Sequence, residues 1–249
     1  MNLKAIQRAL LVLGLLLIGV AGGWLWERHS ERSNPAGGLA IKDRAAMEQV
    51  VHDYLLNHPE ILPQAMENLR HQDDAKHLAG LSGPVAKAFP GAVLGNAHGA
   101  QVLVEFTDYA CGYCRKAEAD VAALIAENPK LMVVIRELPI LTPESATAAK
   151  MALAAAKQGK YAAFHRALFA LDGPDARNID LAAKQAGLDL DRARRDAADP
   201  AIAAEVERNL DFARTLGFNG TPSWVIGERL LSGAIGKDAL AEAIKGAQS

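Results

Sequence analysis

The stretch Gln101-Val102-Leu103-Val104-Glu105-Phe106-Thr107-Asp108-Tyr109-Ala110-Cys111-Gly112-Tyr113-Cys114 decides the fold. Its first part is mostly apolar and β-branched, which predicts a largely buried strand. Apolar residues then recur at helical spacing from Arg115 to Ala126, so a helix follows. The only two cysteines of the chain, Cys111 and Cys114, therefore lie where a strand turns into a helix.

A cysteine at the start of a helix is chemically activated. The Cys111 thiol would face unpaired backbone N–H groups and the positive end of the helix dipole, and both favour the thiolate. Gly112 permits a close approach, and Cys114 lies one turn further on, near enough to close a disulfide. This placement predicts a redox-active pair.

Two other uses of a cysteine pair fit this spacing less well. A structural disulfide across so short a loop would contribute about 2 kcal/mol at most. Zinc needs four ligands, and the pair supplies two of them. The other histidine candidates lie in a separate, polar N-terminal region: His52, His58, His71 and His77. Redox chemistry is therefore favoured over a structural disulfide and a metal site.

Composition limits the class of protein. With 249 residues, 50% of them hydrophobic, the chain can bury a sizeable core and still carry a small extra module. The formal net charge of −2 and the lack of a basic stripe interleaved with aromatic residues argue against binding to nucleic acid or to an anionic membrane surface. We expect no nucleic-acid partner.

Residues 1–26 have the composition of a targeting or anchoring segment. Lys4 and Arg8 precede an uncharged apolar run over residues 9–26, which is just long enough to span a bilayer. A small-residue site within that run is compatible with signal cleavage, whereas Trp24 and Trp26 favour an uncleaved anchor. Either alternative predicts export to an oxidising compartment, the periplasm, with residues 27–42 as a flexible linker.

Residues 43–78 are predicted to form a small helical module. One apolar stripe begins at Met47 with Asp43 as N-cap, a break follows at 57–59, and a second stripe begins at Leu62. The stripe residues are Met47, Val50, Val51, Tyr54, Leu55, Leu62, Ala65, Met66 and Leu69. Two short helices cannot bury these faces on each other alone. Because a further linker is expected over 79–91, we predict that the module drives self-association.

Residues 92–249 are predicted to form an α/β catalytic domain with a helical insertion. Strands are expected near 92–94, at 101–106 and at 131–135, and a hairpin of strands at 223–226 and 229–231. Helical periodicity fills 145–216, where Thr142 and Pro143 open the first helix, and returns at 237–245. The core is thus divided into 92–140 and 217–249, with 141–216 inserted between them.

The chain resembles the DsbA family of thioredoxin-fold oxidoreductases. The residues that carry the resemblance are Val104 to Cys114, Gln158-Gly159-Lys160-Tyr161, Phe164-His165-Arg166-Ala167-Leu168-Phe169 and Gly220-Thr221-Pro222-Ser223. They cover the chain from about Val93 to its end and imply a thioredoxin fold. Within the family, the module that precedes them is similar to the N-terminal domain of ScsC-type (suppression of copper sensitivity) proteins, which implies oligomerisation.

The resemblance also implies roles for individual residues. Thr221-Pro222 would be the loop facing the cysteines, with a cis bond that leaves the Thr221 backbone free to pair with a substrate peptide. Cys111 would be the exposed attacking thiol and Cys114 the resolving one. Gly112 and Tyr113 would tune the pair, and Tyr113 brings no cation. We therefore expect a less oxidising pair than in DsbA itself, closer to the bacterial disulfide isomerases.

Glu105 precedes Cys111 by six residues on the strand that leads into the site. In the family an acid at this spacing is buried near the cysteines and assists proton transfer. The alternative is a glutamate at a strand end that points to solvent. The resemblance favours the first role for Glu105.

Three functions remain open on the sequence alone. The first, which we favour, is an oligomeric disulfide isomerase or reductase acting on cysteine-containing exported proteins. The second is a monomeric dithiol oxidase. Either would exchange electrons with a membrane partner of the DsbD or DsbB type and needs no cofactor beyond the Cys111–Cys114 disulfide. The third is a copper-tolerance protein that binds Cu(I) on the same thiolates.

Overall fold

The computed structural model describes residues 41–247. The predicted anchor over 1–26 and nearly all of the linker over 27–42 lie outside the described residues. Within the described part, no helix is both long and apolar enough to cross a membrane. The chain divides into two compact units, residues 1–65 and 66–249.

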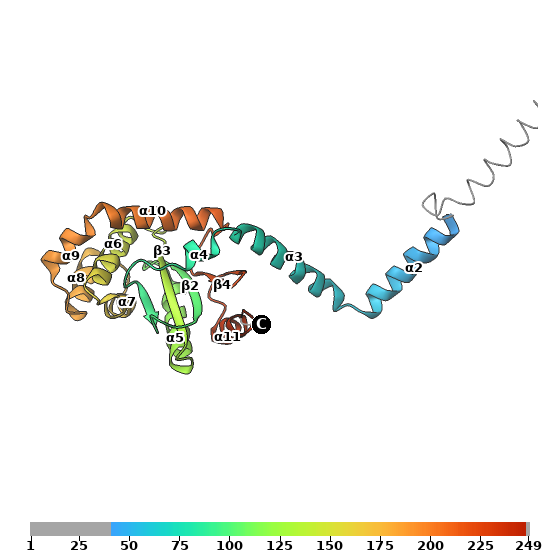
Figure 1. Cartoon of the computed structure of the whole chain (residues 1–249), viewed down its shortest axis with the longest axis horizontal. Helices are drawn as coiled ribbons and strands as arrows, with labels where there is room; N and C mark the ends of the chain where they lie inside the picture. The colour runs from blue at the N-terminus through green and yellow to red at the C-terminus, as the bar shows by residue number, and fades with distance from the viewer. Residues whose placement is uncertain (1–40, 248–249) are drawn as a thin grey trace, which may run out of the picture. The chain divides into compact units, whose positions relative to one another are not determined.

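The larger unit is built on a mixed sheet of strand order β1-β3-β2-β4-β5 (Figure 1). The strands are β1 (Val93–Gly95), β2 (Gln101–Thr107), β3 (Leu131–Glu137), β4 (Ser223–Ile226) and β5 (Arg229–Ser232). β2 and β3 run parallel, with Glu105 opposite Ile135, while β1, β4 and β5 pair antiparallel with their neighbours. The sequence predicted all of these strands.

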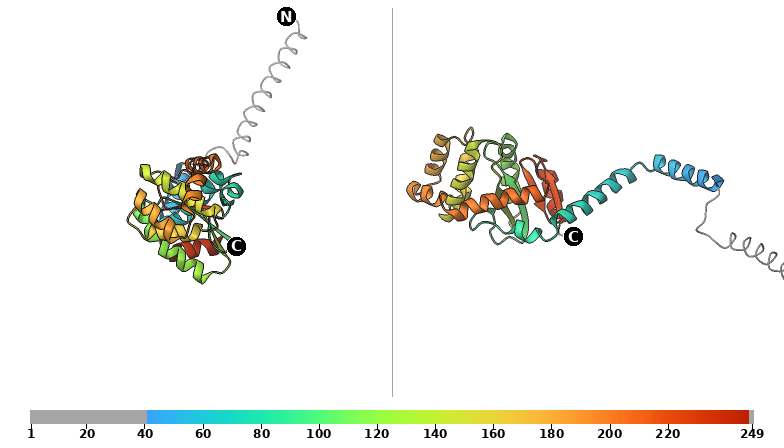
Figure 2. Two further views of the ribbon diagram at one scale, coloured as in Figure 1. Left: turned by 90° about the vertical axis from the view of Figure 1, so that its left-hand side faces the viewer. Right: turned by 90° about the horizontal axis from the view of Figure 1, so that it is seen from above.

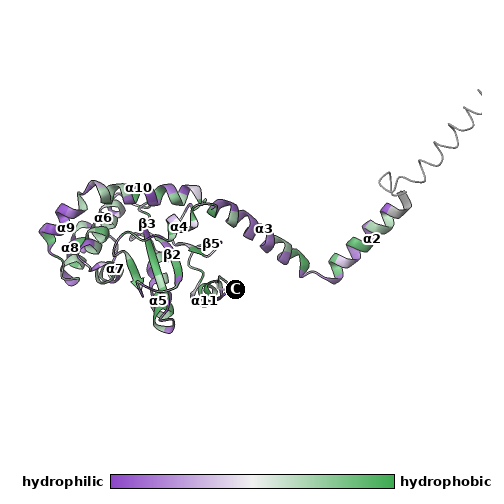
Figure 3. Cartoon of the chain, in the orientation of Figure 1, coloured by the Kyte–Doolittle hydropathy of each residue, from purple (hydrophilic) through white to green (hydrophobic). Residues whose placement is uncertain are grey.

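Helices cover both faces of this sheet, as the views in Figures 1 and 2 show. On one face, α5 (Gly112–Glu127) and α11 (Lys237–Gly246) pack with Leu103 and Val133. On the other, α10 (Pro200–Thr215) packs with Phe106 and Val134. Because helices cover both faces of the sheet, β2 and β3 are mostly apolar on both faces, as Figure 3 shows, with buried polar residues such as Glu105 and Arg136 among them.

The helical insertion gathers at one end of the sheet (Figure 1). It consists of α6 (Pro143–Lys157), α7 (Tyr161–Phe169), α8 (Ala176–Gln185), α9 (Leu190–Ala197) and α10. α6 begins as predicted, with the Thr142 hydroxyl accepting from the Ser145 N–H and Pro143 in the first turn. The mixed sheet and its helices agree with the predicted α/β class and its thioredoxin-like core.

The N-terminal helices differ from expectation in two respects. α2 (Ile41–Asn57) already includes Asp43, so Asp43 is not its N-cap. The second apolar stripe begins α3 (Ile61–Leu78), but the helix runs on through the charged stretch 71–77, where Lys76 pairs with Asp73 one turn away, and Glu67 pairs with His71. The predicted break between the two helices is present.

The second half of α3 belongs to the larger unit and contacts its hairpin. Glu67 forms an ion pair with Arg229 (2.8 Å), and the Asp74 carboxylate accepts the backbone N–H of Leu230 on β5 (2.9 Å). The side chain of Leu78 is buried in the core. The last part of the segment predicted as a self-association module, residues 66–78, is thus in contact with the rest of the larger unit.

The segment expected as a linker over 79–91 is also structured. It contains the short helix α4 (Ser82–Ala86), whose Val85 is fully buried. The guanidinium of Arg136, on β3, donates to the carbonyl oxygens of Pro84, Val85 and Lys87. A buried cation held by backbone acceptors fixes this segment to the sheet, and glycine and proline content alone gave no sign of it.

Candidate functional site

The two cysteines lie at the end of β2 and the start of α5, as the sequence predicted. Cys111 is the N-cap residue, and its sulfur accepts the backbone N–H of Cys114 (3.4 Å). The backbone N–H of Cys111 donates to the carbonyl of Asp108 (2.9 Å), which closes the turn out of β2. Both cysteines are free thiols.

The Thr221–Pro222 loop faces this pair. Its peptide bond is cis, as the resemblance implied. The Cys111 thiol donates to the Thr221 carbonyl (3.1 Å), so that carbonyl is occupied rather than free in this state. Cys111 is only 5% exposed and belongs to the buried core, whereas we expected an exposed thiol.

Gly112 and Tyr113 sit on the outside of the helix start. A side chain at Gly112 would meet nothing within 4 Å, so no close approach inside the protein requires glycine there. Tyr113 is 64% exposed, and the Lys116 ammonium lies 5.5 Å from the centroid of its ring. Tyr113 itself brings no cation, but the Lys116 cation lies over its ring, at the i, i+3 spacing of a helix.

Glu105 is buried, and the alternative that it points to solvent is wrong. Its residue is 1% exposed, and one carboxylate oxygen has no hydrogen-bond partner. Burial first, and then the nearby charge of Glu118, raise the pKa of Glu105 well above its ordinary value. Burial likewise raises the pKa of the Cys114 thiol. An acid and a thiol whose proton affinities both rise in one buried region can exchange a proton.

Replacing Glu105 with Gln is expected to slow thiol–disulfide exchange at pH 7 on the order of a hundredfold, because Cys114 then loses its proton acceptor. Stopped-flow fluorescence of oxidation and reduction would measure the rates. The exposed variant Glu144→Gln is the matched control and should keep them. An unchanged rate in Glu105→Gln would contradict a proton-transfer role.

A buried polar network lies beside the site, and its residues were not among the predicted site residues. Tyr109 and Tyr161 both donate to the Glu137 carboxylate (3.1 and 2.6 Å). Tyr109 also contacts the His165 ring nitrogen Nδ1 (2.9 Å), and His165 Nε2 lies 2.7 Å from Glu118. Burial raises the pKa of Glu137 to about 8, while the two tyrosine hydroxyls oppose that rise. Polar residues within an apolar strand and helix were the available signal.

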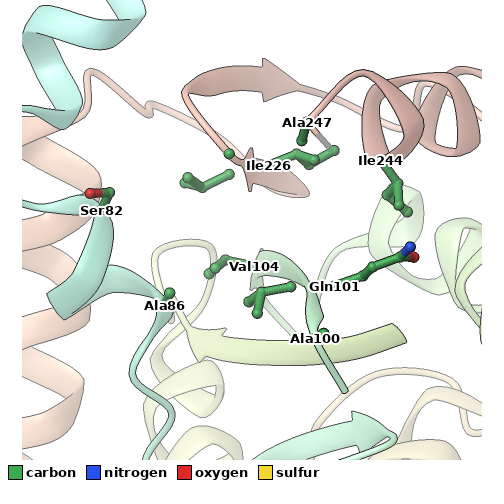
Figure 4. A pocket seen from close by; sticks show the side chains of 11 residues that line it. Ser82, Ala86, Ala100, Gln101, Val104, Ile226, Ile244 and Ala247 are labelled. Carbon is green, nitrogen blue, oxygen red and sulfur yellow. The ribbon is translucent and has the colours of Figure 1, made fainter. Parts of the chain in front are cut away.

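A cavity of about 280 Å³ lies elsewhere on the unit (Figure 4). Its walls are apolar apart from Ser82 and Gln101, and they include Val104, Ile226 and Ile244. Gln101 begins β2, whereas the cysteines follow its other end. None of the predicted site residues lines this cavity. Within residues 41–247 there is also no group of three or more His, Cys, Asp or Glu side chains arranged to hold a metal ion.

Two family models match the chain. The model of the DSBA-like thioredoxin domain matches residues 102–245, and that of the copper resistance protein ScsC N-terminal domain matches residues 43–76. Their boundaries agree with the α/β domain and with α2 and most of α3.

Solved structures of similar proteins carry the same fold. A thioredoxin-like oxidoreductase from Silicibacter pomeroyi is 41% identical, covering 63% of this chain and 91% of its own, with a TM-score of 0.61. The thiol-disulfide exchange protein alpha-DsbA2 from Wolbachia pipientis is 28% identical over 72% and 97% of the two chains, with a TM-score of 0.66. Proteus mirabilis ScsC, in a transitional conformation, is 27% identical over 84% and 98%, with a TM-score of 0.61.

Among curated proteins, the Na(+)/H(+) antiporter NhaA 3 of Salinispora tropica is 34% identical over 149 residues, which is 58% of this chain. The match covers 23% of that antiporter, so the chain spans about a quarter of the length of this relative. The model of the DSBA-like thioredoxin domain matches more than half of the chain. The same part of the chain contains the two cysteines at a helix start, the cis-proline loop and the mixed sheet. The chain belongs to the DsbA-like thioredoxin family, with an ScsC-type N-terminal domain.

Proposed function

We propose that this protein is an exported thiol:disulfide oxidoreductase that works as an oligomeric isomerase and reductase of protein disulfides. The observation that carries the chemistry is the Cys111 sulfur at the N-terminus of α5, held 3.1 Å from the carbonyl of Thr221 next to cis-Pro222. An extended substrate that pairs with the backbone of this loop would bring its own sulfur to Cys111.

The reaction begins with the Cys111 thiolate attacking one sulfur of a substrate disulfide. A mixed disulfide forms, the substrate S–S bond breaks, and the second substrate sulfur leaves as a thiolate. In isomerisation, another substrate thiolate attacks the mixed disulfide, a new substrate disulfide forms, and Cys111 leaves unchanged. No electrons are exchanged overall.

In reduction, Cys114 attacks Cys111 instead and releases the substrate as a dithiol. Cys114 must first lose its proton, and we assign Glu105 as the acceptor because burial has raised the pKa of both groups. The pair is then a disulfide and needs a dithiol reductant. A membrane partner of the DsbD type would supply the electrons, and cysteine-containing periplasmic proteins would be the substrates.

Self-association is proposed to proceed through the apolar face of α2. Met47, Val50, Val51 and Tyr54 are 48%, 68%, 57% and 54% exposed. Several large apolar side chains that are about half exposed or more on one helix are typical of an interaction surface. Several Cys111 thiols around one substrate would favour isomerisation, since released substrate thiolates meet a second site.

A monomeric dithiol oxidase is the second candidate. The contacts of Glu67 with Arg229 and of Asp74 with Leu230 favour it, because they engage part of the N-terminal helices within the catalytic unit. A Cu(I) site on the two thiolates, and tethering to the inner membrane through residues 9–26, remain predictions.

The test uses the chain from Ser30 onward and the variant Val51→Glu/Tyr54→Glu, which places charge in the apolar face. Ala45→Glu/Gln49→Glu adds the same charge at exposed positions away from that face and is the matched control. Sedimentation velocity gives the oligomeric state, and refolding of scrambled ribonuclease gives isomerase activity.

We expect an oligomer with isomerase activity in the wild type and the control, and a monomer without it in Val51→Glu/Tyr54→Glu. A wild type that is monomeric, fails on scrambled ribonuclease and rapidly oxidises reduced ribonuclease would replace the isomerase with the oxidase. A dispersed variant that keeps full isomerase activity would show that assembly is not required.

A further inference from the structure

Asp108, three residues before Cys111, joins separate segments around the site. Its residue is 1% exposed. One carboxylate oxygen, Oδ1, accepts the backbone N–H of Ala110 (2.8 Å) and the hydroxyl of Ser145 (2.7 Å). The other, Oδ2, accepts the backbone N–H groups of Ile140 (2.8 Å) and Leu141 (3.0 Å). One buried side chain thus holds the cysteine turn, the loop after β3 and the first turn of α6 together.

The loop that Asp108 holds presents apolar side chains to solvent. Ile140 and Leu141 are 41% and 49% exposed. Within residues 79–247, the large exposed apolar side chains are these two, Tyr113 beside the cysteines, and Leu181 on α8. Three of these four side chains are therefore attached, through Asp108 or directly, to the cysteine turn.

Asp108 is the hydrogen-bond acceptor for the backbone N–H groups of Ile140 and Leu141. Pro139 has no N–H of its own, and the preceding N–H, that of Leu138, donates to the carbonyl of Thr107 (2.8 Å). A carboxylate offers two oxygens and four lone-pair sites, which matches the four donors. Asparagine has one such oxygen, and its NH₂ group would face either the Ile140 and Leu141 pair or the Ala110 and Ser145 pair.

We propose that Asp108 is a positioning residue for substrate selection. It holds Ile140 and Leu141 beside Cys111 so that they bind the apolar residues flanking a cysteine in an unfolded polypeptide. This rests on the proposed function. The occupant is a polypeptide with apolar side chains next to its cysteine, because Asp108 ties the loop that carries the apolar pair to the turn that carries the attacking sulfur.

The test compares two disulfide substrates with one small dithiol. The peptides carry leucine or serine on both sides of a cysteine that is disulfide-bonded to a chromophore, and dithiothreitol reduces the oxidised protein. We expect Asp108→Asn to lower kcat/KM about tenfold on the leucine peptide, mainly through KM, and less than twofold on the serine peptide. Reduction by dithiothreitol should change less than twofold.

Ile140→Ser/Leu141→Ser should reproduce the loss on the leucine peptide, and adding Asp108→Asn should lower it no further. Leu181→Ser, an exposed apolar position on α8, is the control and should change nothing. Equal slowing of both peptides and of dithiothreitol by Asp108→Asn would mean that Asp108 acts on the cysteines themselves.

An unchanged leucine preference in Ile140→Ser/Leu141→Ser overturns the proposal even if Asp108→Asn does not fold. Failure of the proposed function is distinguishable, because a wild type without thiol–disulfide exchange would react with neither peptide.

Discussion

Replacing Arg136 with Met is expected to lower the free energy of unfolding by about 3–5 kcal/mol. The Arg136 side chain is 1% exposed and lies 2.6 Å from the Glu205 carboxylate, which is 4% exposed. It also donates to Asn209 and to the carbonyl groups of the α4 segment. The variant would leave one oxygen of Glu205 and three backbone carbonyl groups buried without the Arg136 cation, and that desolvation dominates the loss.

Urea unfolding at pH 7, followed by circular dichroism, would measure the change. Arg208 is the matched control because it pairs with the other oxygen of Glu205 from a side chain that is 56% exposed. Arg208→Met should cost about 1 kcal/mol or less. Equal losses in the two variants would contradict the assignment of Arg136 as the buried anchor of α4.

The folded protein is expected to lose stability as the pH rises from about 5 to 8, and Glu137→Gln should remove much of that loss. Glu137 has a pKa of about 8 when folded against 4.5 as its ordinary value. The folded state therefore holds a proton that the unfolded state has released, so the stabilisation is complete below pH 4.5 and is lost as the pH passes 8. The change is on the order of 3–5 kcal/mol.

Unfolding by urea at intervals between pH 5 and 9 would test this in both proteins. Gln keeps an oxygen that accepts from Tyr109 and Tyr161, so the contacts survive while the titration is removed. Glu207→Gln, at an exposed position, is the control and should follow the wild type. Buried Glu105, whose pKa is also raised, should leave part of the slope in place. Parallel curves for wild type and Glu137→Gln would contradict the assignment.

Much of the α/β domain could be predicted because its signals are local. The apolar runs of β2 and β3, the Thr142-Pro143 helix start and the Cys111 turn each depend on neighbours within a few residues. The cis bond before Pro222 was implied by the resemblance alone, because an X–Pro bond can adopt either isomer.

What could not be predicted depends on partners far apart in the chain. Besides the nearby Ala110, Asp108 binds groups 32 to 37 residues away, and Arg136 binds Glu205, 69 residues away. Hydrophobic periodicity marks such residues only as polar positions in an apolar pattern and does not identify their partners. The same applies to α3, whose charged residues are typical of a solvent-exposed helix in the sequence, whereas Asp74 binds the backbone of β5 in the structure.

The contact between Asp74 and Leu230 bears on how this protein avoids aggregation. β5 is the last strand of the sheet, and a strand at an edge offers unpaired N–H groups to any other extended chain. The proposed function would bring the protein into repeated contact with unfolded chains, which puts its own sheet edge at particular risk. The Asp74 carboxylate occupies the Leu230 N–H and places negative charge along that edge. A shortened protein that begins after Leu78 would expose β5 to misfolded substrates, and we expect it to co-aggregate with them.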